Sequence, residues 1–323
     1  MMVLAPMQKP ELDNSVFIVG PTASGKTSVA LELAGNITHG DQAGGEIISL
    51  DSMQLWRGMD IGTAKPTAEE RRRVRHHLIE LLEPSESFSV ARYVEAAQAA
   101  VAEIAGRGRV PLFVGGTALY LKALLAGLFE GPSADWALRA ELRRIAAEHG
   151  PAHLHERLQS VDPGTAQRLH PNDLRRIVRA LEVYEKTGTP ISELQRQWSA
   201  QRSGRQPPIF GIARDRAGLY DRINRRVDEM MQGGLLDEVR RLLTMNPGRE
   251  ARQALGYREL IAHLASEIPS LDDAIELIKR NTRRFAKHQL TWFRAFTGII
   301  WIEMRPGDSP QSAATRIRLQ LQQ

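Results

Sequence analysis

The sequence predicts an α/β protein. Its expected core is a P-loop domain with a mostly parallel, doubly wound sheet, joined by a helical insertion and a helical C-terminal part. Two observations carry this prediction. Short apolar runs alternate with helical segments up to residue 126, and such alternation is typical of parallel sheets. A glycine-rich turn also separates the first strand from the first helix, where such sheets bind phosphate groups.

The first strands and helices are predicted from residue type and hydrophobic period. β-branched and aromatic residues predict strands, and these are expected over residues 15–20, 46–50, 74–82 and 110–114. Apolar residues at helical spacing predict helices over residues 26–34, 89–105 and 117–126. Ser89 is the expected N-cap of the second helix.

The pattern changes between about residues 133 and 202. Strand signals vanish there, and helical periods rich in Arg, Glu, Leu and Ala replace them. Strands are expected again at 208–213 and 298–303, with helix from 219 to about 296 between them. We therefore predict a catalytic core of residues 1–132 and 203–323, interrupted by a helical insertion of residues 133–202.

Composition excludes several classes of protein. The chain has no cysteine, which excludes disulfides, thiolate nucleophiles and cysteine-ligated zinc and suits a reducing compartment. No apolar run approaches the roughly 18 residues of a membrane span, and residues 1–14 lack the apolar segment of a signal peptide. We expect a cytoplasmic protein with no membrane partner. Only seven of its 43 basic residues are lysine, which favours phosphate contacts, although a GC-rich genome gives the same excess of arginine.

One segment matches the phosphate-binding motif G-x-x-x-x-G-K-[ST], which is typical of nucleotide- and ATP-binding loops. It reads Gly20, Pro21, Thr22, Ala23, Ser24, Gly25, Lys26 and Thr27, and we predict that all eight residues bind a diphosphate. The glycines let backbone N–H groups point inward, and Lys26 and the helix N-terminus add positive charge. Thr27 can place its hydroxyl on Mg²⁺, the expected cofactor. The motif does not say which phosphate compound is bound.

A carboxylate is expected beside this loop. In NTPases a second strand usually ends in an Asp that helps to hold Mg²⁺, but the run 110–114 is followed by Gly115, Gly116 and Thr117. Asp51 instead follows the strand 46–50. The carboxyl ends of parallel strands face one crevice, so Asp51 should meet the loop there. At this position an Asp is a general base, an indirect metal ligand or the cap of a loop, and position alone does not choose among them.

Several motifs together resemble the tRNA dimethylallyltransferase family. They span most of the chain, in order, at residues 20–27, 48–54, 60–66, 115–120, 170–182, 253–257 and 287–294. The P-loop is generic, whereas the segments at 51–54, 115–117 and 287–294 are much more specific in combination. Eukaryotic relatives carry a C-terminal zinc finger, so the absence of cysteine and the early end resemble the bacterial form.

The resemblance implies a reaction. A dimethylallyl group would pass from dimethylallyl diphosphate to the N6 amine of the adenosine at position 37 of tRNA, next to the anticodon, with release of diphosphate. Asp51 would take the N6 proton, and Thr117 would lie at the diphosphate end of the channel. Lys26 and Thr27 would absorb the leaving group's charge with Mg²⁺. Arg222 is a further candidate for the diphosphate, although it equally fits a solvated helix face.

The resemblance also implies RNA contacts, because the target base must leave its stack and meet cationic and aromatic groups. The expected tRNA-binding residues are Asp51, Ser52, Met53, Gln54, Thr117, Arg139, Arg175, Arg176, Arg179, Gln253, Gly256, Tyr257, Lys287, His288, Gln289, Trp292 and Arg294. Tyr257 is expected to stack on a base, and the insertion is expected to contact the anticodon region. Taken singly, each segment also fits a core aromatic beside a solvated basic face. Met230 is interpreted as helix packing and not as part of a prenyl pocket.

Two other functions share parts of this pattern. A P-loop kinase has the same core and loop, but the missing Asp after residue 114 and the arginine-rich helical half count against it. An RNA-binding protein that uses its P-loop as a nucleotide switch would leave Asp51 without a task. A monomer is expected, and the set of substrate tRNAs is not predicted.

Overall fold

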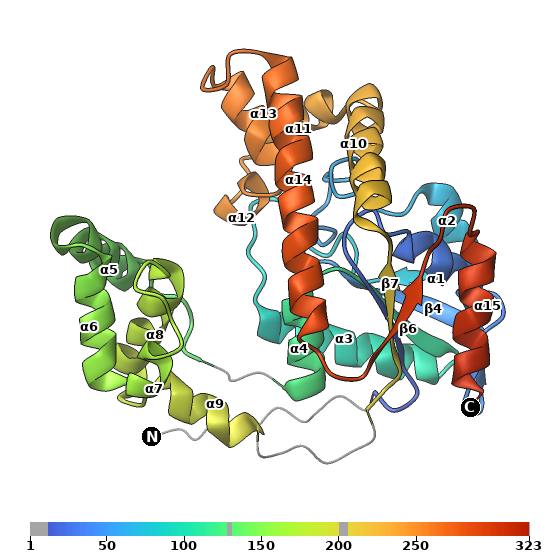
Figure 1. Ribbon diagram of the computed structural model, residues 1–323, viewed down its shortest axis with the longest axis horizontal. Helices are drawn as coiled ribbons and strands as arrows, with labels where there is room; N and C mark the ends of the chain where they lie inside the picture. The colour runs from blue at the N-terminus through green and yellow to red at the C-terminus, as the bar shows by residue number, and fades with distance from the viewer. Residues whose placement is uncertain (1–11, 128–130, 200–205, 323) are drawn as a thin grey trace. The chain divides into compact units, whose positions relative to one another are not determined.

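A six-stranded sheet forms the core of the larger part of the protein, in a computed structural model that describes residues 12–127, 131–199 and 206–322 (Figure 1). The strands run in the order β5-β4-β6-β1-β7-β8, and every neighbouring pair is parallel. Their bounds are β1 Val16–Val19, β4 Gly45–Leu50, β5 His76–His77, β6 Val110–Gly115, β7 Ile209–Ala213 and β8 Ile299–Glu303. A short antiparallel pair, β2 (Thr38–His39) and β3 (Gln42–Ala43), lies apart from this sheet. The predicted parallel α/β core is confirmed.

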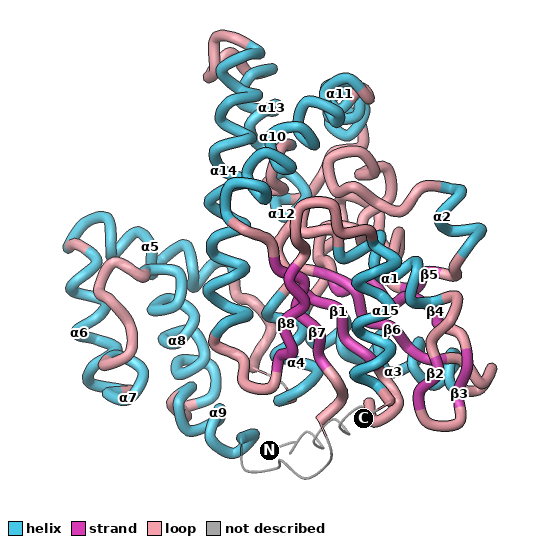
Figure 2. The backbone as a smooth tube through the Cα atoms, turned by 45° about the vertical axis from the view of Figure 1, so that its right-hand side comes forward, coloured by secondary structure: helices cyan, strands magenta, loops and turns pink. Residues whose placement is uncertain are grey.

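Both faces of the sheet are apolar, as a doubly wound sheet requires. On one face Ile18, Ile47 and Leu112 belong to a buried cluster that includes residues of α1 and α15 (Figure 2). On the other face Phe17 stacks on Phe113, with ring centroids 4.5 Å apart. The helices of this part are α1 Lys26–Ala34, α2 Ala68–Arg73, α3 Val90–Ala105, α4 Ala118–Ala126, α10 Arg216–Gln232, α11 Leu235–Thr244, α12 Arg249–Arg252, α13 Tyr257–Leu264, α14 Leu271–Arg294 and α15 Pro310–Leu321. None of the helices in the described ranges is long and apolar enough to cross a membrane.

The chain divides into two compact units. The larger unit is Met1–Lys122 with Arg205–Gln323, and the smaller is Ala123–Gly204, which contains the predicted insertion 133–202. The smaller unit has its own apolar core, which includes Leu142, Leu154 and Ile177. Its helices are α5 Trp136–His149, α6 Pro151–Val161, α7 Pro163–Ala166, α8 Leu174–Thr187 and α9 Ile191–Ser199.

A buried carboxylate organises the smaller unit. Glu182 on α8 is fully buried and accepts hydrogen bonds from Arg139 Nε (2.9 Å) and Nη2 (2.8 Å), from Arg179 Nη1 (2.5 Å) and from the Asp135 backbone N–H (2.7 Å). Burial opposes its charge, but the hydrogen bonds from Arg139 and Arg179 prevail and hold its pKa below the usual range. Arg139 and Arg179 were predicted to bind tRNA; the structure shows that both hold Glu182, and their contact with tRNA stays a prediction.

The predicted strand 74–82 is mostly wrong. Only His76–His77 form β5, because Leu78 (φ 57°) and Glu80 (φ 56°) adopt left-handed backbone that ends an extended strand. Glu80 is held there by Arg71 at 2.8 Å and by Lys65 at 3.4 Å. Four elements were not predicted, namely the strands β2 and β3 and the helices α2 and α15. The Thr67–Glu70 capping box of α2 and the Ser309-Pro310 start of α15 are signals that could have found the two helices.

Replacing the buried carboxylate should destabilise the smaller unit. Glu182→Gln removes the negative charge between Arg139 and Arg179 and replaces one of the accepting oxygens with an amide NH₂ group, which is a donor. Losing this charge should lower the free energy of unfolding by about 3–5 kcal/mol. Since the pKa of Glu182 is lowered on folding, its stabilisation is present above the unfolded pKa of about 4.3 and is lost as pH falls through the folded pKa. Chemical denaturation at several pH values measures both effects.

Glu185→Gln on the same helix is the matched control. Its carboxylate pairs with Arg157 at the surface, where an ion pair contributes about 1 kcal/mol or less. Equal destabilisation by the two variants would contradict the role assigned to Glu182.

Candidate active site

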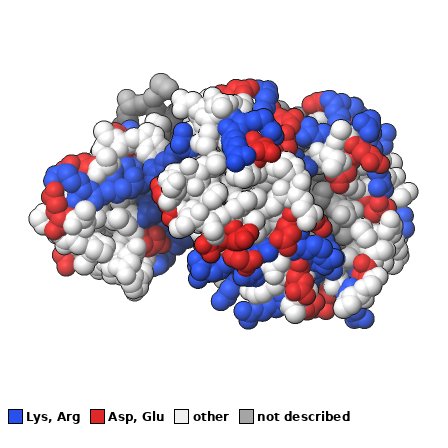
Figure 3. All heavy atoms as spheres, turned by 90° about the horizontal axis from the view of Figure 1, so that it is seen from above, with Lys and Arg blue, Asp and Glu red and all other residues white. Residues whose placement is uncertain are grey.

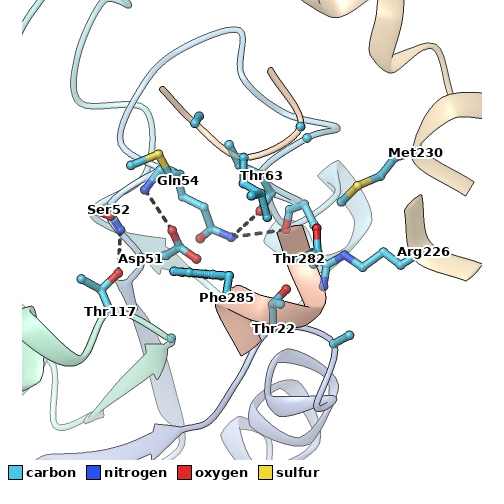
Figure 4. A pocket seen from close by; sticks show the side chains of 18 of the residues that line it. Thr22, Asp51, Ser52, Gln54, Thr63, Thr117, Arg226, Met230, Thr282 and Phe285 are labelled. Atoms are coloured by element: carbon cyan, nitrogen blue, oxygen red, sulfur yellow. Dashed lines mark hydrogen bonds between the residues drawn. The ribbon is translucent and has the colours of Figure 1, made fainter. Parts of the chain in front are cut away.

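The loops that follow β1, β4 and β6 open on one cavity of about 510 Å³ in the larger unit (Figure 4). The lining includes Thr22 after β1, Asp51 after β4 and Thr117 after β6. The other walls come from α10, α13 and α14. The cavity therefore lies at the carboxyl ends of parallel strands, where α/β sheets bind their ligands.

The loop between β1 and α1 adopts a backbone conformation that requires glycine at two positions of the motif. Gly20 (φ 154°) approaches β7 so closely that a Cβ would lie 2.7 Å from the Ile212 carbonyl oxygen. Gly25 (φ 98°) is left-handed and is the N-cap of α1. Any other residue at these two positions would clash or strain the loop, so the motif spacing reflects backbone geometry. Lys26 begins the helix, and its Nζ donates to the Pro21 carbonyl oxygen at 3.4 Å.

The cavity contains two half-buried cations, Lys26 and Arg226, near the carboxylate of Asp51. Burial lowers the pKa of Lys26 to about 8, with Asp51 opposing this effect and Arg226 adding to it. Burial likewise lowers the pKa of Arg226, again opposed by Asp51. Neither cation lies within ion-pair distance of a carboxylate in the ranges that the structure describes. Bringing an anion into this cavity would relieve the cost of burying two positive charges.

Two further arginines hold the loop from its other side. Arg214 Nε donates to the Ser24 carbonyl oxygen at 2.8 Å, and Arg222 Nε donates to the Ala23 carbonyl oxygen at 2.9 Å. Arg222 also lines a second cavity of about 220 Å³ together with Lys26 and Thr27. Arg222 therefore lies beside the predicted diphosphate site, and its place on α10 is not merely a solvated helix face. Arg214 was not predicted.

Asp51 and Thr117 are brought together by backbone hydrogen bonds. Asp51 Oδ1 accepts from the Met53 N–H at 2.9 Å, Thr117 Oγ1 accepts from the Ser52 N–H at 3.1 Å, and the Thr117 N–H donates to Leu50 at 3.1 Å. Asp51 thus caps its own loop while its second oxygen remains available. From its position in the sequence, Asp51 could be a loop cap, a general base or an indirect metal ligand. The geometry is compatible with a capping role together with a catalytic one.

Gln54 and Tyr257 were predicted to contact RNA, but their polar atoms have internal partners. Gln54 accepts from the Ser49 hydroxyl at 2.8 Å, and its Nε2 donates to Thr63 and Ala64 (Figure 4). Tyr257 is fully buried, so its ring is not free to stack on a base. Its hydroxyl donates to Glu238 at 2.5 Å.

Glu238 explains why this region is ordered. It is a buried residue of α11 that accepts hydrogen bonds from the backbone N–H groups of Asp60 (2.9 Å), Ile61 (2.8 Å) and Gly62 (3.1 Å), in addition to Tyr257. Gly62 is needed because a Cβ there would lie 2.4 Å from the Tyr257 ring. One carboxylate therefore fixes the segment that follows the Asp51 loop. Sequence patterns gave Glu238 no prominence because its partners are distant along the chain.

One face of α14 lines the cavity and its neighbouring face is exposed. Asn281, Phe285 and His288 line the cavity at i, i+4 and i+7, a spacing that was visible in the sequence. Phe285 is 47% exposed and was not predicted. The predicted RNA contacts Lys287, Trp292 and Arg294 are exposed, as are Arg175 and Arg176 on α8 in the smaller unit. Ser52, Met53, Gln253 and Gly256 also line the cavity.

Gln289 differs from its neighbours on α14. It is buried, 7% exposed, and both ends of its amide bond to backbone groups inside the protein. The predicted contact between Gln289 and tRNA does not fit this position.

Part of the cavity is apolar. Its lining includes Ile223, Val227 and Met230 of α10, Leu235 of α11 and Ile278 of α14. Met230 was interpreted as helix packing, and the structure corrects this because its side chain lines the cavity (Figure 4).

The oxygen atoms that line the cavity suit Mg²⁺ better than a metal ion that takes all its ligands from the protein. The described residues contain no group of three or more His, Cys, Asp or Glu side chains that could hold a metal ion. Thr27 and Asp51 nevertheless line the same cavity and offer oxygen atoms. Mg²⁺ is commonly bound through one or two protein oxygens, water and substrate phosphates, so these residues fit that ion.

Comparisons with known proteins identify the family of this chain. The model of the IPP transferase family matches residues 54–296. The chain is 43% identical over 318 residues to the tRNA dimethylallyltransferase of Acetivibrio thermocellus, covering 96% of this chain and 98% of the relative. It is 49% identical over 305 residues to the tRNA dimethylallyltransferase of Symbiobacterium thermophilum, covering 94% and 93%.

Solved structures give the same result. The tRNA isopentenylpyrophosphate transferase of Bacillus halodurans superposes with a TM-score of 0.68 at 42% identity, covering 95% of this chain and 96% of that one. A eukaryotic dimethylallyltransferase acting on tRNA has a TM-score of 0.76 at 27% identity, covering 94% and 77%. With a family model over most of its length and relatives of this similarity, the chain belongs to the IPP transferase family.

Proposed function

We propose that this chain transfers the dimethylallyl group of dimethylallyl diphosphate to the N6 amine of the adenosine at position 37 of tRNA. The observation that carries the proposal is the shared cavity, which is lined both by residues of the Gly20–Thr27 loop, including the half-buried Lys26, and by Asp51. Family membership supports it, because curated relatives are named tRNA dimethylallyltransferases.

The leaving group belongs at the positive end of the cavity. The bond between the allylic carbon and the diphosphate oxygen breaks, and its electron pair leaves with the diphosphate. The loop N–H groups, Lys26 and Arg222 stabilise that charge, and Arg226 extends the same positive field. Thr27 would hold Mg²⁺, which when bound supplies further positive charge at the phosphate oxygens.

The amine belongs at the opposite end. The N6 lone pair forms the new bond to the allylic carbon, and Asp51 accepts the N6 proton, which makes it the general base. Thr117, whose Oγ1 holds the Ser52 N–H, keeps the Asp51 loop beside the end of β6. The apolar side chains Ile223, Val227 and Met230 suit the five-carbon group.

The exposed face of α14 is the proposed RNA contact in the larger unit. Lys287, Trp292 and Arg294 are exposed, and Phe285 leads from this face into the cavity. Arg175 and Arg176 of the smaller unit are also exposed and remain proposed contacts to the anticodon region. Figure 3 shows basic groups at several places on one view of the protein, with acidic groups between them. Binding should therefore depend on local contacts as well as on net charge.

The direct test uses purified protein, Mg²⁺, dimethylallyl diphosphate and unmodified tRNA, followed by mass analysis of the digested nucleosides. The proposal predicts a five-carbon mass gain on adenosine that requires the diphosphate substrate. ATP hydrolysis or phosphorylation of a small molecule, with no mass gain across a full tRNA pool, would favour a kinase instead.

Asp51→Asn should remove most of the chemical step. The amide oxygen can still accept from the Met53 N–H, so the loop is kept, but the general base is lost. We expect the single-turnover rate to fall about 10²- to 10⁴-fold with tRNA affinity nearly unchanged. Asp237→Asn, at an exposed position on α11, is the control. A variant that binds tRNA poorly but turns over normally would exclude Asp51 as the base.

Activity should depend on the charge of Lys26. Because its pKa is lowered to about 8, the free enzyme loses this charge as pH rises through about 8, well below the usual pKa of lysine. We expect kcat/KM for dimethylallyl diphosphate to decrease over the same pH range. In Lys26→Arg this alkaline decrease should disappear, because a guanidinium stays charged. If the variant shows the same decrease, another group causes it.

Trp292→Ala should weaken tRNA binding without slowing transfer. The indole is 41% exposed, and a stacked base is worth about 1–3 kcal/mol, so KM for tRNA should rise about tenfold or more. Leu319→Ala, also exposed but on α15, is the control. Steady-state kinetics with varied tRNA measures the effect, and an unchanged KM would remove Trp292 from the interface.

A further inference from the structure

Gln289 joins the two ends of the reaction site. Its Oε1 accepts a hydrogen bond from the Thr22 N–H of the β1–α1 loop at 2.9 Å. Its Nε2 donates to the Gly116 carbonyl oxygen, directly before Thr117, at 2.8 Å. The side chain is buried, so a single amide spans the loops that follow β1 and β6.

The glycines after β6 make room for this amide. A Cβ at Gly116 would lie 2.3 Å from Gln289 Nε2 and 3.3 Å from the Gly20 carbonyl oxygen. A Cβ at Gly115 would lie 2.1 Å from the Leu50 carbonyl oxygen. The backbone after β6 can therefore approach both β4 and the β1–α1 loop, and Gln289 fills the remaining space. This packing accounts for glycine where many P-loop proteins carry an Asp.

The two backbone groups that Gln289 contacts lie close in sequence to residues of the proposed reaction site. Gly116 is followed by Thr117, whose Oγ1 accepts from the Ser52 N–H next to Asp51. On the other side, Thr22 belongs to the loop that ends in Lys26 and Thr27. The distance between the diphosphate and the general base is thus set through one side chain from α14. The Thr22 N–H is occupied by Gln289, so it is not among the loop N–H groups that face the diphosphate.

We propose that Gln289 is a positioning residue, which fixes the separation between the diphosphate loop and the Asp51–Thr117 pair and contacts neither substrate. The inference rests on the proposed transfer reaction. Since a shift of about 1 Å between reacting groups can cost about 100-fold in rate, losing this amide should affect the chemical step more than binding.

Gln289→Met tests this, because it removes both hydrogen bonds at similar side-chain volume. We expect the single-turnover rate to fall about 10- to 100-fold. Dissociation constants for dimethylallyl diphosphate and tRNA should change less than about threefold, since the binding groups remain. Gln320→Met, the same change at an exposed position on α15, is the control with an unchanged rate. A normal rate, or a loss confined to tRNA affinity, would overturn the inference.

Gln289→Glu provides a second test that does not depend on a damaged fold. An ionised carboxylate cannot donate to Gly116, whereas the protonated acid reproduces both the donor and the acceptor of the amide. Burial raises the pKa of such a carboxyl. The ratio of variant to wild-type rate should therefore rise as pH falls, and a ratio that stays flat with pH would contradict the positioning role.

Assays of the wild-type protein distinguish failure of the proposed function from failure of the positioning role. If it transfers no dimethylallyl group to tRNA, the proposed function fails. If it transfers the group and both Gln289 variants do so equally well, only the positioning role fails.

Discussion

The partly desolvated positive charge beside Asp51 is the constraint on which the rest of the site depends. Desolvation lowers the pKa values of Lys26 and Arg226, and Asp51 offsets part of that cost for both, with Glu229 also acting on Arg226. Such a site is incomplete without an anion. The loop glycines, the helix N-terminus at Lys26 and the arginines behind the loop all serve the same electrostatic task. A diphosphate leaving group makes use of that arrangement without any need for nucleotide hydrolysis.

The helical C-terminal half does more than provide a surface for RNA. Arg214 and Arg222 hold the carbonyl oxygens of the diphosphate loop, and Glu238 holds the segment after the Asp51 loop. Gln289 connects the diphosphate loop to Gly116 beside Thr117. The loops after β1 and β6 follow strands in the first half of the chain but are fixed by side chains from the second half. In the proposed reaction, α14 therefore contributes both to RNA contact and to the geometry of the chemical step.

What the sequence could predict is local or periodic. The strands followed from apolar runs, and the loop followed from a motif whose glycines are required by its own backbone. The position of Asp51 followed from the rule that carboxyl ends of parallel strands share an edge. The features that local patterns missed have a common physical origin, because a side chain's partners can lie far along the chain. Tyr257 is buried against Glu238, and Arg139 is held by Glu182. The strand after Val74 ends early because ion pairs hold Glu80 in left-handed backbone. No local pattern distinguishes such residues from exposed ones.

The most direct test is a crystal structure of the protein with Mg²⁺ and dimethylallyl thiolodiphosphate, whose bridging sulfur slows loss of the diphosphate. The account predicts diphosphate density within the Gly20–Thr27 loop, in contact with Lys26. It also predicts the allylic carbon on the side of the cavity that faces Asp51. Diphosphate bound elsewhere, or an allylic group directed away from Asp51, would contradict the assignment of the two ends of the cavity.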